Sequence, residues 1–114
     1  MDSSLDRTLA ALADPTRRRV VELLRKRSCR PSEIADRMAL TRPALSRHLR
    51  VLRRAGIVSE RIEEDDARAR LYTLREQPFS ELGDWLREVE AFWGDQLNAF
   101  KQHAERSPPR KRRR

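Results

Sequence analysis

The residues with the clearest chemistry are the arginines of one short segment, residues 41–55. On a helical wheel at about 100° per residue, its apolar residues fall within an arc of roughly 160° and its arginines on the opposite arc. The apolar arc holds Ala44, Leu45, Leu49, Val51, Leu52 and Ala55, and the polar arc holds Arg42, Pro43, Ser46, Arg47, Arg50, Arg53 and Arg54. Guanidinium groups on a rigid helix can bind phosphates and base edges. The segment therefore predicts a helix that contacts nucleic acid.

The alternative interpretation of this segment is a charged face that only keeps a helix soluble. Such helices usually carry carboxylates one turn away from their cations, but no acidic residue lies between Thr41 and Ala55. The whole chain has 26 Lys and Arg against 18 Asp and Glu, a net charge of +8. This excess favours a polyanionic partner, with nucleic acid as the first candidate and an anionic membrane as the second.

Capping residues and prolines mark the helices that must position this segment. Ser3, with Asp6 three residues on, predicts a first helix that carries Leu5, Leu9 and Leu12 on one face. Asp14-Pro15 opens a second helix, and Pro31 opens a short third one. Thr41 caps the fourth helix, which ends at Gly56. The inward residues expected for the second and third helices are Val20, Val21, Leu23, Leu24, Ile34, Ala35 and Met38.

The remaining elements complete a recognisable architecture. Residues 57–63 and 68–74 predict a β-hairpin about Asp65-Asp66, and a long last helix is expected over about 79–105. A short helix, a turn, a longer helix and a hairpin make a helix-turn-helix followed by a wing. The predicted fold is mainly α (α+β), a winged helix-turn-helix of five helices with a two-stranded hairpin wing. We expect one domain over 1–106 and a disordered basic tail over 107–114.

Four segments together resemble one family: LAALADPTRRRVVELL, SEIADRM, TRPALSRHLRVLRRAGIV and RARLYTL. They are similar to the bacterial ArsR/SmtB family of winged-helix repressors over about residues 5–75. The resemblance implies a homodimer whose first and last helices form the interface. It also implies two recognition helices that enter successive major grooves, and repression by covering promoter DNA.

The resemblance assigns roles to particular residues. Base-reading positions at the start of the recognition helix correspond to Arg42, Pro43, Ser46 and Arg47, next to the capping Thr41. Phosphate or minor-groove contacts correspond to Arg50, Arg53, Arg68 and Arg70.

Two features depart from the family pattern. Ala39 stands at the usual turn glycine, at a cost of about 1 kcal/mol if that position needs a positive φ. The acidic wing tip, residues 63–66, argues against deep insertion of the wing.

Metal-sensing members of the family have paired cysteines before the turn, or a carboxylate and histidine cluster on the last helix. Arg30 and Ser32 occupy the positions of those cysteines, and the single cysteine, Cys29, is interpreted as a small buried hydrophobe. His103 is followed by the cation Arg106 and lacks a ligand set. His48 lies in the apolar arc and is expected to be packed. We therefore predict no metal and no cofactor, and the sequence names no small-molecule effector. The aromatic last helix, with Phe92-Trp93 followed by Leu97 and Phe100, resembles the metal-independent branch of the family.

A broad aromatic stripe marks the last helix, with apolar residues at steps of three and four. Its members are Leu82, Trp85, Leu86, Val89, Phe92, Trp93, Leu97 and Phe100. One small domain can hardly cover both tryptophans, and aromatic clusters are typical of interfaces. The predicted dimer interface comprises Leu5, Leu9, Leu82, Trp85, Val89, Phe92, Trp93 and Phe100.

These features predict a sequence-specific transcriptional regulator, a repressor that binds an inverted-repeat operator as a homodimer. Two alternatives stay open: a redox- or metal-responsive switch that uses Cys29, and a protein that coats DNA without sequence preference. An enzyme is not expected, because the chain has neither a glycine-rich phosphate loop nor a histidine beside a candidate nucleophile. The chain shows no signal-peptide pattern and no apolar run long enough for a membrane span, so we expect no membrane association and a bacterial cytoplasmic protein on the nucleoid.

Overall fold

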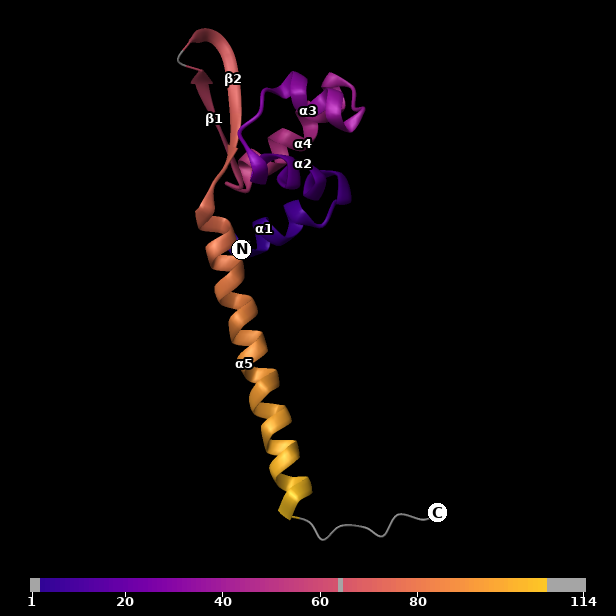
Figure 1. Ribbon diagram of the computed structural model, residues 1–114, viewed down its shortest axis with the longest axis vertical. Coiled ribbons are helices and arrows are strands. Elements are labelled where there is room, and N and C mark those ends of the chain that lie inside the picture. Colours follow the sequence, from indigo (N-terminus) through magenta and orange to yellow (C-terminus); the bar gives the residue numbers. More distant parts are fainter. Residues whose placement is uncertain (1–2, 64, 107–114) are drawn as a thin grey trace. The chain divides into compact units, whose positions relative to one another are not determined.

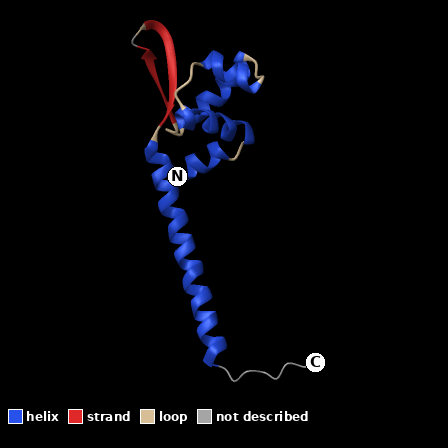
Figure 2. Cartoon of the chain, viewed as in Figure 1, coloured by secondary structure: helices blue, strands red, loops and turns tan. Residues whose placement is uncertain are grey.

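The structure, a computed structural model, describes residues 3–63 and 65–106, apart from the side chains of residues 66–68. Within them lie five helices and one antiparallel hairpin, as predicted (Figures 1 and 2). The elements are α1 (Ser4–Leu12), α2 (Pro15–Lys26), α3 (Pro31–Met38), α4 (Arg42–Arg54), β1 (Val58–Glu63), β2 (Asp66–Leu74) and α5 (Glu76–Arg106). The chain divides into two units, Met1–Leu82 and Gly83–Arg114. The predicted tail, residues 107–114, lies outside the described residues.

Local caps make the predicted starts of α1 and α2. The Ser3 hydroxyl accepts a hydrogen bond from the Asp6 backbone N–H at 3.0 Å, and the Asp6 carboxylate accepts one from the Ser3 N–H at 3.2 Å. Asp14 accepts hydrogen bonds from the backbone N–H groups of Thr16 and Arg17. The bond from the Arg17 N–H is the main cause that holds the pKa of Asp14 below its usual value. These caps satisfy N–H groups that a helix leaves unpaired.

The core lies in the first unit, where α4 packs against α2, α3 and β1 (Figure 1). Ile34, Leu52 and Ile57 are completely buried there. The first helix enters this core through a different face from the predicted one: Thr8 and Ala11 are buried. Among the described residues, the buried hydrophobic core comprises Ala11, Val20, Val21, Leu24, Cys29, Ile34, Ala35, Met38, Leu45, Leu49, Leu52, Ile57, Val58 and Tyr72.

Two arginines of α2 secure the C-terminal end of α1. The Arg17 Nε donates to the Ala11 carbonyl at 2.6 Å, and the Arg18 Nη1 donates to the Leu12 carbonyl at 2.7 Å. The last carbonyls of a helix have no partner within the helix and carry its negative dipole end. These cations therefore serve the fold, and the sequence alone did not distinguish them from arginines that face solvent.

The boundaries that differ most from the prediction are those of α5 and the hairpin. Helix α5 begins at Glu76, three residues before the expected Phe79, because Pro78 lies in the first helical turn, where its missing N–H leaves no intrahelical bond unmade. Strand β2 begins at Asp66 and pairs this residue with Glu63, across a register shift between Ile62 and Glu63. Strand β2 therefore begins earlier than expected and β1 begins at Val58 rather than Ile57, and the register of the hairpin is not that of a simple two-residue turn.

The turn between α3 and α4 contains backbone strain at Ala39. This residue has φ 53° and ψ 41°, in the left-handed region, and the next N–H, that of Leu40, donates to the Ala35 carbonyl at 3.0 Å. The left-handed conformation brings the Cβ close to a backbone carbonyl oxygen. Ala39 therefore adopts the positive φ for which a conformational cost of about 1 kcal/mol is expected.

Ala39→Gly should raise the free energy of unfolding by about 1 kcal/mol, because glycine has no Cβ to strain this turn. Urea denaturation monitored by circular dichroism measures the change. The control is Ala10→Gly, on an exposed position of α1, which should lower stability by about 0.5–1 kcal/mol. A loss of stability in Ala39→Gly would contradict the strain at Ala39.

Candidate nucleic-acid interface

Helix α4 has one buried face and one exposed face. Leu45, Leu49 and Leu52 are buried in the core, and the Thr41 hydroxyl caps the helix by accepting from the Ala44 N–H at 3.2 Å. Seven of the predicted DNA-contacting residues lie on this helix or its cap, and all seven are exposed: Thr41, Arg42, Pro43, Ser46, Arg47, Arg50 and Arg53. The fold thus brings them to the surface of one element, as the helical periodicity indicated.

The arginines of α4 differ in their partners. Within the described residues, Arg42, Arg47 and Arg50 take part in no ion pair. Arg53 does: its Nη1 lies 3.1 Å from Oε2 of Glu60, on β1. Helix α4 itself contains no carboxylate, and tertiary packing supplies one to its C-terminal end. Among the described residues, the α4 cations without an ion pair are therefore Arg42, Arg47 and Arg50 in the first three turns, the part that reads base edges in helix-turn-helix proteins, and Arg54 at the end of the helix.

Glu60 is the centre of a cluster that joins α4 to the wing. Its carboxylate also accepts hydrogen bonds from Nη1 of Arg70 and, at 2.8 Å, from the hydroxyl of Tyr72, both on β2. We call Arg53, Glu60, Arg70 and Tyr72 the Glu60 cluster. Burial and the neighbouring Glu60 carboxylate raise the pKa of Tyr72. The Tyr72 hydrogen bond, followed by that of Arg70, lowers the pKa of Glu60, so Glu60 is a carboxylate at neutral pH.

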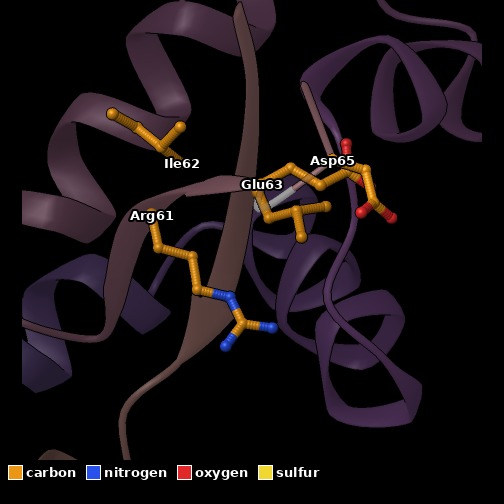
Figure 3. A pocket seen from close by; sticks show the side chains of 5 residues that line it. Arg61, Ile62, Glu63 and Asp65 are labelled. Atoms are coloured by element: carbon orange, nitrogen blue, oxygen red, sulfur yellow. The ribbon is translucent and has the colours of Figure 1, made fainter. Parts of the chain in front are cut away.

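The wing has a second link to the helix-turn-helix. Nη2 of Arg30, just before α3, lies 2.5 Å from Oε2 of Glu63 on β1. Glu63 also borders a hollow on the hairpin surface, together with Arg61, Ile62 and Asp65 (Figure 3). Part of the acidic wing-tip charge is therefore neutralised by Arg30.

The structure describes only one of the two side chains that were predicted to make wing contacts. Arg70 is exposed on β2 but belongs to the Glu60 cluster. The side chain of Arg68 lies outside the described residues, as does Glu64 of the wing tip. Sequence reasoning did not identify Glu60 or the Arg30–Glu63 pair. The signal that could have found Glu60 is the alternation of Val58, Glu60 and Ile62, which share one face of β1.

Cys29 is buried in the core, as its interpretation as a small hydrophobe requires. Its backbone pairs with that of Tyr72, and its thiol lies 3.5 Å from the Arg27 carbonyl. Burial, followed by the nearby Glu33 carboxylate, raises the pKa of the thiol. Among the described residues, no group of three or more His, Cys, Asp or Glu side chains could hold a metal ion. A buried thiol with a raised pKa is a poor nucleophile and a poor metal ligand.

The Cys29 thiol should therefore react at least about tenfold more slowly with a thiol reagent in native buffer than in urea. We also expect DNA affinity to be unchanged by zinc or by a chelator, and to change only a few fold in Cys29→Ser. Absorbance of the released thiolate and fluorescence anisotropy of labelled duplex measure the two effects. A tenfold loss of affinity on adding stoichiometric zinc, absent from Cys29→Ser, would instead support the metal-responsive alternative.

Helix α5 carries most of the exposed large apolar side chains among the described residues. The exposed fraction rises from 40% at Trp85 to 72% at Phe100, and the Phe92 and Trp93 rings meet edge to face with centroids 5.7 Å apart. Of the other residues predicted for a dimer interface, Leu5, Leu82 and Val89 are half-buried and Leu9 is exposed. An apolar stripe of this extent is unusual on a monomer surface.

The described part of the chain contains no helix with the length and apolar character that crossing a bilayer requires. The long α5 alternates its aromatic residues with acidic and basic ones, such as Asp84, Arg87 and Glu88.

Comparisons with known proteins agree with this arrangement. A family model described as bacterial regulatory protein, arsR family, matches residues 14–60. The HTH-type transcriptional regulator Rv2034 of Mycobacterium tuberculosis is 34% identical over 99 residues, which cover 87% of each chain. The HTH-type transcriptional regulator CmtR of Mycobacterium bovis is 36% identical over 96 residues, which cover 83% of this chain and 79% of the relative. An ArsR-like transcriptional regulator from Rhodococcus sp. RHA1 has a similar structure, with a TM-score of 0.76, 28% identity, and coverage of 91% of this chain and 95% of that chain.

Proposed function

Because this chain belongs to the ArsR family of bacterial transcriptional regulators, which are not enzymes, we propose that it is a repressor that binds an inverted-repeat operator as a homodimer. The observation that carries the proposal is α4, whose leucine face is buried while Arg42, Arg47 and Arg50 are exposed without ion pairs among the described residues.

We assign direct readout to the first half of α4. Arg42 and Arg47 lie on a helix anchored by Leu45 and Leu49, so each guanidinium can be held in a fixed plane against a guanine edge. Pro43 and Ser46 complete this surface. Arg50 lies one turn further on and suits a phosphate contact. Arg53 and Arg70 can reach phosphates only in competition with Glu60, and Arg68 is assigned to the wing contact by its position in β2.

The dimer is proposed from the stripe on α5. A second copy of the chain would cover Trp85, Phe92, Trp93 and Phe100, which are exposed in a single chain. A two-fold dimer presents two recognition helices related by symmetry, so its operator is an inverted repeat with half-sites about one helical turn apart. Binding of such a dimer across a promoter would block transcription. The protein would then act in the cytoplasm on the nucleoid, without a metal cofactor.

Selection of bound sequences from a pool of random duplexes tests the proposal. A specific regulator should enrich one inverted repeat, and a footprint should cover both half-sites. Enrichment of a single asymmetric half-site would contradict the dimeric arrangement.

A protein that coats DNA without preference is the second candidate, favoured by the net charge of +8. Such a protein would enrich no sequence in the same selection. The basic run at 110–114 would contribute to either function through counterion release, which is insensitive to sequence.

A further inference from the structure

The Glu60 cluster places one carboxylate between two cations that would otherwise face DNA. We propose that Glu60 is a specificity-determining residue, which competes with DNA phosphates for Arg53 and Arg70 and so lowers affinity for random duplex more than affinity for the operator. This inference rests on the proposed DNA-binding function.

The geometry makes the carboxylate the fixed member of the cluster. The Glu60 side chain is only 16% exposed, and it accepts a hydrogen bond from the buried Tyr72. Tyr72 is in turn held by two backbone hydrogen bonds to Cys29, at 2.8 and 3.1 Å. Arg53 and Arg70 are 54% and 59% exposed, so a polyanion can reach both. A phosphate can therefore take either guanidinium while Glu60 stays in place.

The competition affects the two kinds of duplex unequally. Binding to random duplex depends almost entirely on phosphate contacts, and many loose arrangements let a free arginine find a phosphate. On the operator, base contacts fix α4 in one register. In that register Arg53 and Arg70 can contact phosphates only from the positions in which their pairing with Glu60 holds them. Because Glu60 ties Arg53 of α4 to Arg70 of β2, it also fixes the wing relative to the recognition helix. Loss of the carboxylate should then favour random duplex.

Glu60→Gln tests this directly, since it removes the charge and keeps the shape and an oxygen that can accept from Tyr72. We expect affinity for random duplex to rise about five- to tenfold near 0.1 M salt, with a salt slope steeper by about two, or about one for each subunit of the dimer. Affinity for the selected operator should change less than about threefold, so the ratio of the two affinities falls. Salt titrations by fluorescence anisotropy on both duplexes give the two affinities, their ratio and the salt slopes.

Two further variants separate this role from net charge and from folding. Glu22→Gln makes the same charge change on α2, where Glu22 pairs with the exposed Arg25, and it should leave the ratio unchanged. Arg53→Gln combined with Glu60→Gln should show a smaller gain on random duplex than Glu60→Gln alone. If Glu60→Gln lowers the melting temperature, Tyr72→Phe separates the two effects: it keeps the charge of Glu60 and removes only its hydroxyl partner, so it should not raise affinity for random duplex. A gain in Tyr72→Phe equal to that in Glu60→Gln would contradict the competition.

The same measurements distinguish failure of this inference from failure of the proposed DNA-binding function. A wild-type protein that prefers its operator, together with a Glu60→Gln variant whose affinity ratio and salt slope match those of Glu22→Gln, would overturn only this inference. A wild-type protein with no preference between the duplexes would overturn both.

Discussion

Trp93→Glu should convert the dimer into a monomer at micromolar concentration. Trp93 is 59% exposed on α5 and packs edge to face against Phe92, so a second copy that covers this stripe would bury the glutamate without a partner. An unpaired buried charge costs about 3–5 kcal/mol, and a two-fold interface contains it twice. The dimer dissociation constant should therefore rise at least about a thousandfold. Sedimentation velocity at several concentrations measures it.

Asn98→Glu is the matched control, because it adds the same charge to the same helix on the face opposite the stripe. This variant should remain a dimer with unchanged operator binding, whereas Trp93→Glu should also lose operator affinity because one helix then binds without its partner. A wild-type protein that sediments as a monomer, or an Asn98→Glu variant that dissociates equally, would contradict the assignment of the stripe to the interface.

Arg47→Ala should cause the second large effect, a loss of operator affinity and of sequence preference together. One bidentate contact to a base contributes about 1–3 kcal/mol of discrimination, and a symmetric dimer makes it twice, or about 2–6 kcal/mol. Random duplex should lose far less, because only a charge is removed there. Anisotropy titrations on the operator and on a scrambled duplex measure both losses.

Arg25→Ala controls for the charge itself, since Arg25 is exposed on α2 and pairs with Glu22. It should lower binding to both duplexes slightly and by the same factor. Deletion of residues 107–114 should likewise lower the affinity for both duplexes by the same factor. If this deletion abolished operator preference while Arg47→Ala preserved it, the assignment of readout to α4 would be wrong.

Much of the fold follows from local signals that act within one turn of the chain. The caps at Ser3, Asp14 and Thr41 start their helices where the sequence predicts, because a side-chain oxygen satisfies N–H groups two or three residues away. The arginine face of α4 follows in the same way from helical periodicity. The sequence predicts a start of the last helix at about Phe79, but a first helical turn tolerates a proline such as Pro78, and α5 begins at Glu76.

Only the tertiary structure decided which charged residues are available to a partner. A simple two-residue turn at Asp65-Asp66 would place Glu60 opposite Leu71, but the register shift places it opposite Tyr72, and a shift of one residue moves every side chain to the other face. The pairing of Arg53 and Arg70 with Glu60 follows from that register. Arg17 and Arg18 cap α1 for a similar reason, because packing brings together groups that are separated along the chain. The sequence by itself therefore determined the helices and the arginine face, through interactions between near neighbours. The division of the arginines between the fold and a partner depended on contacts between elements, which no local pattern encodes.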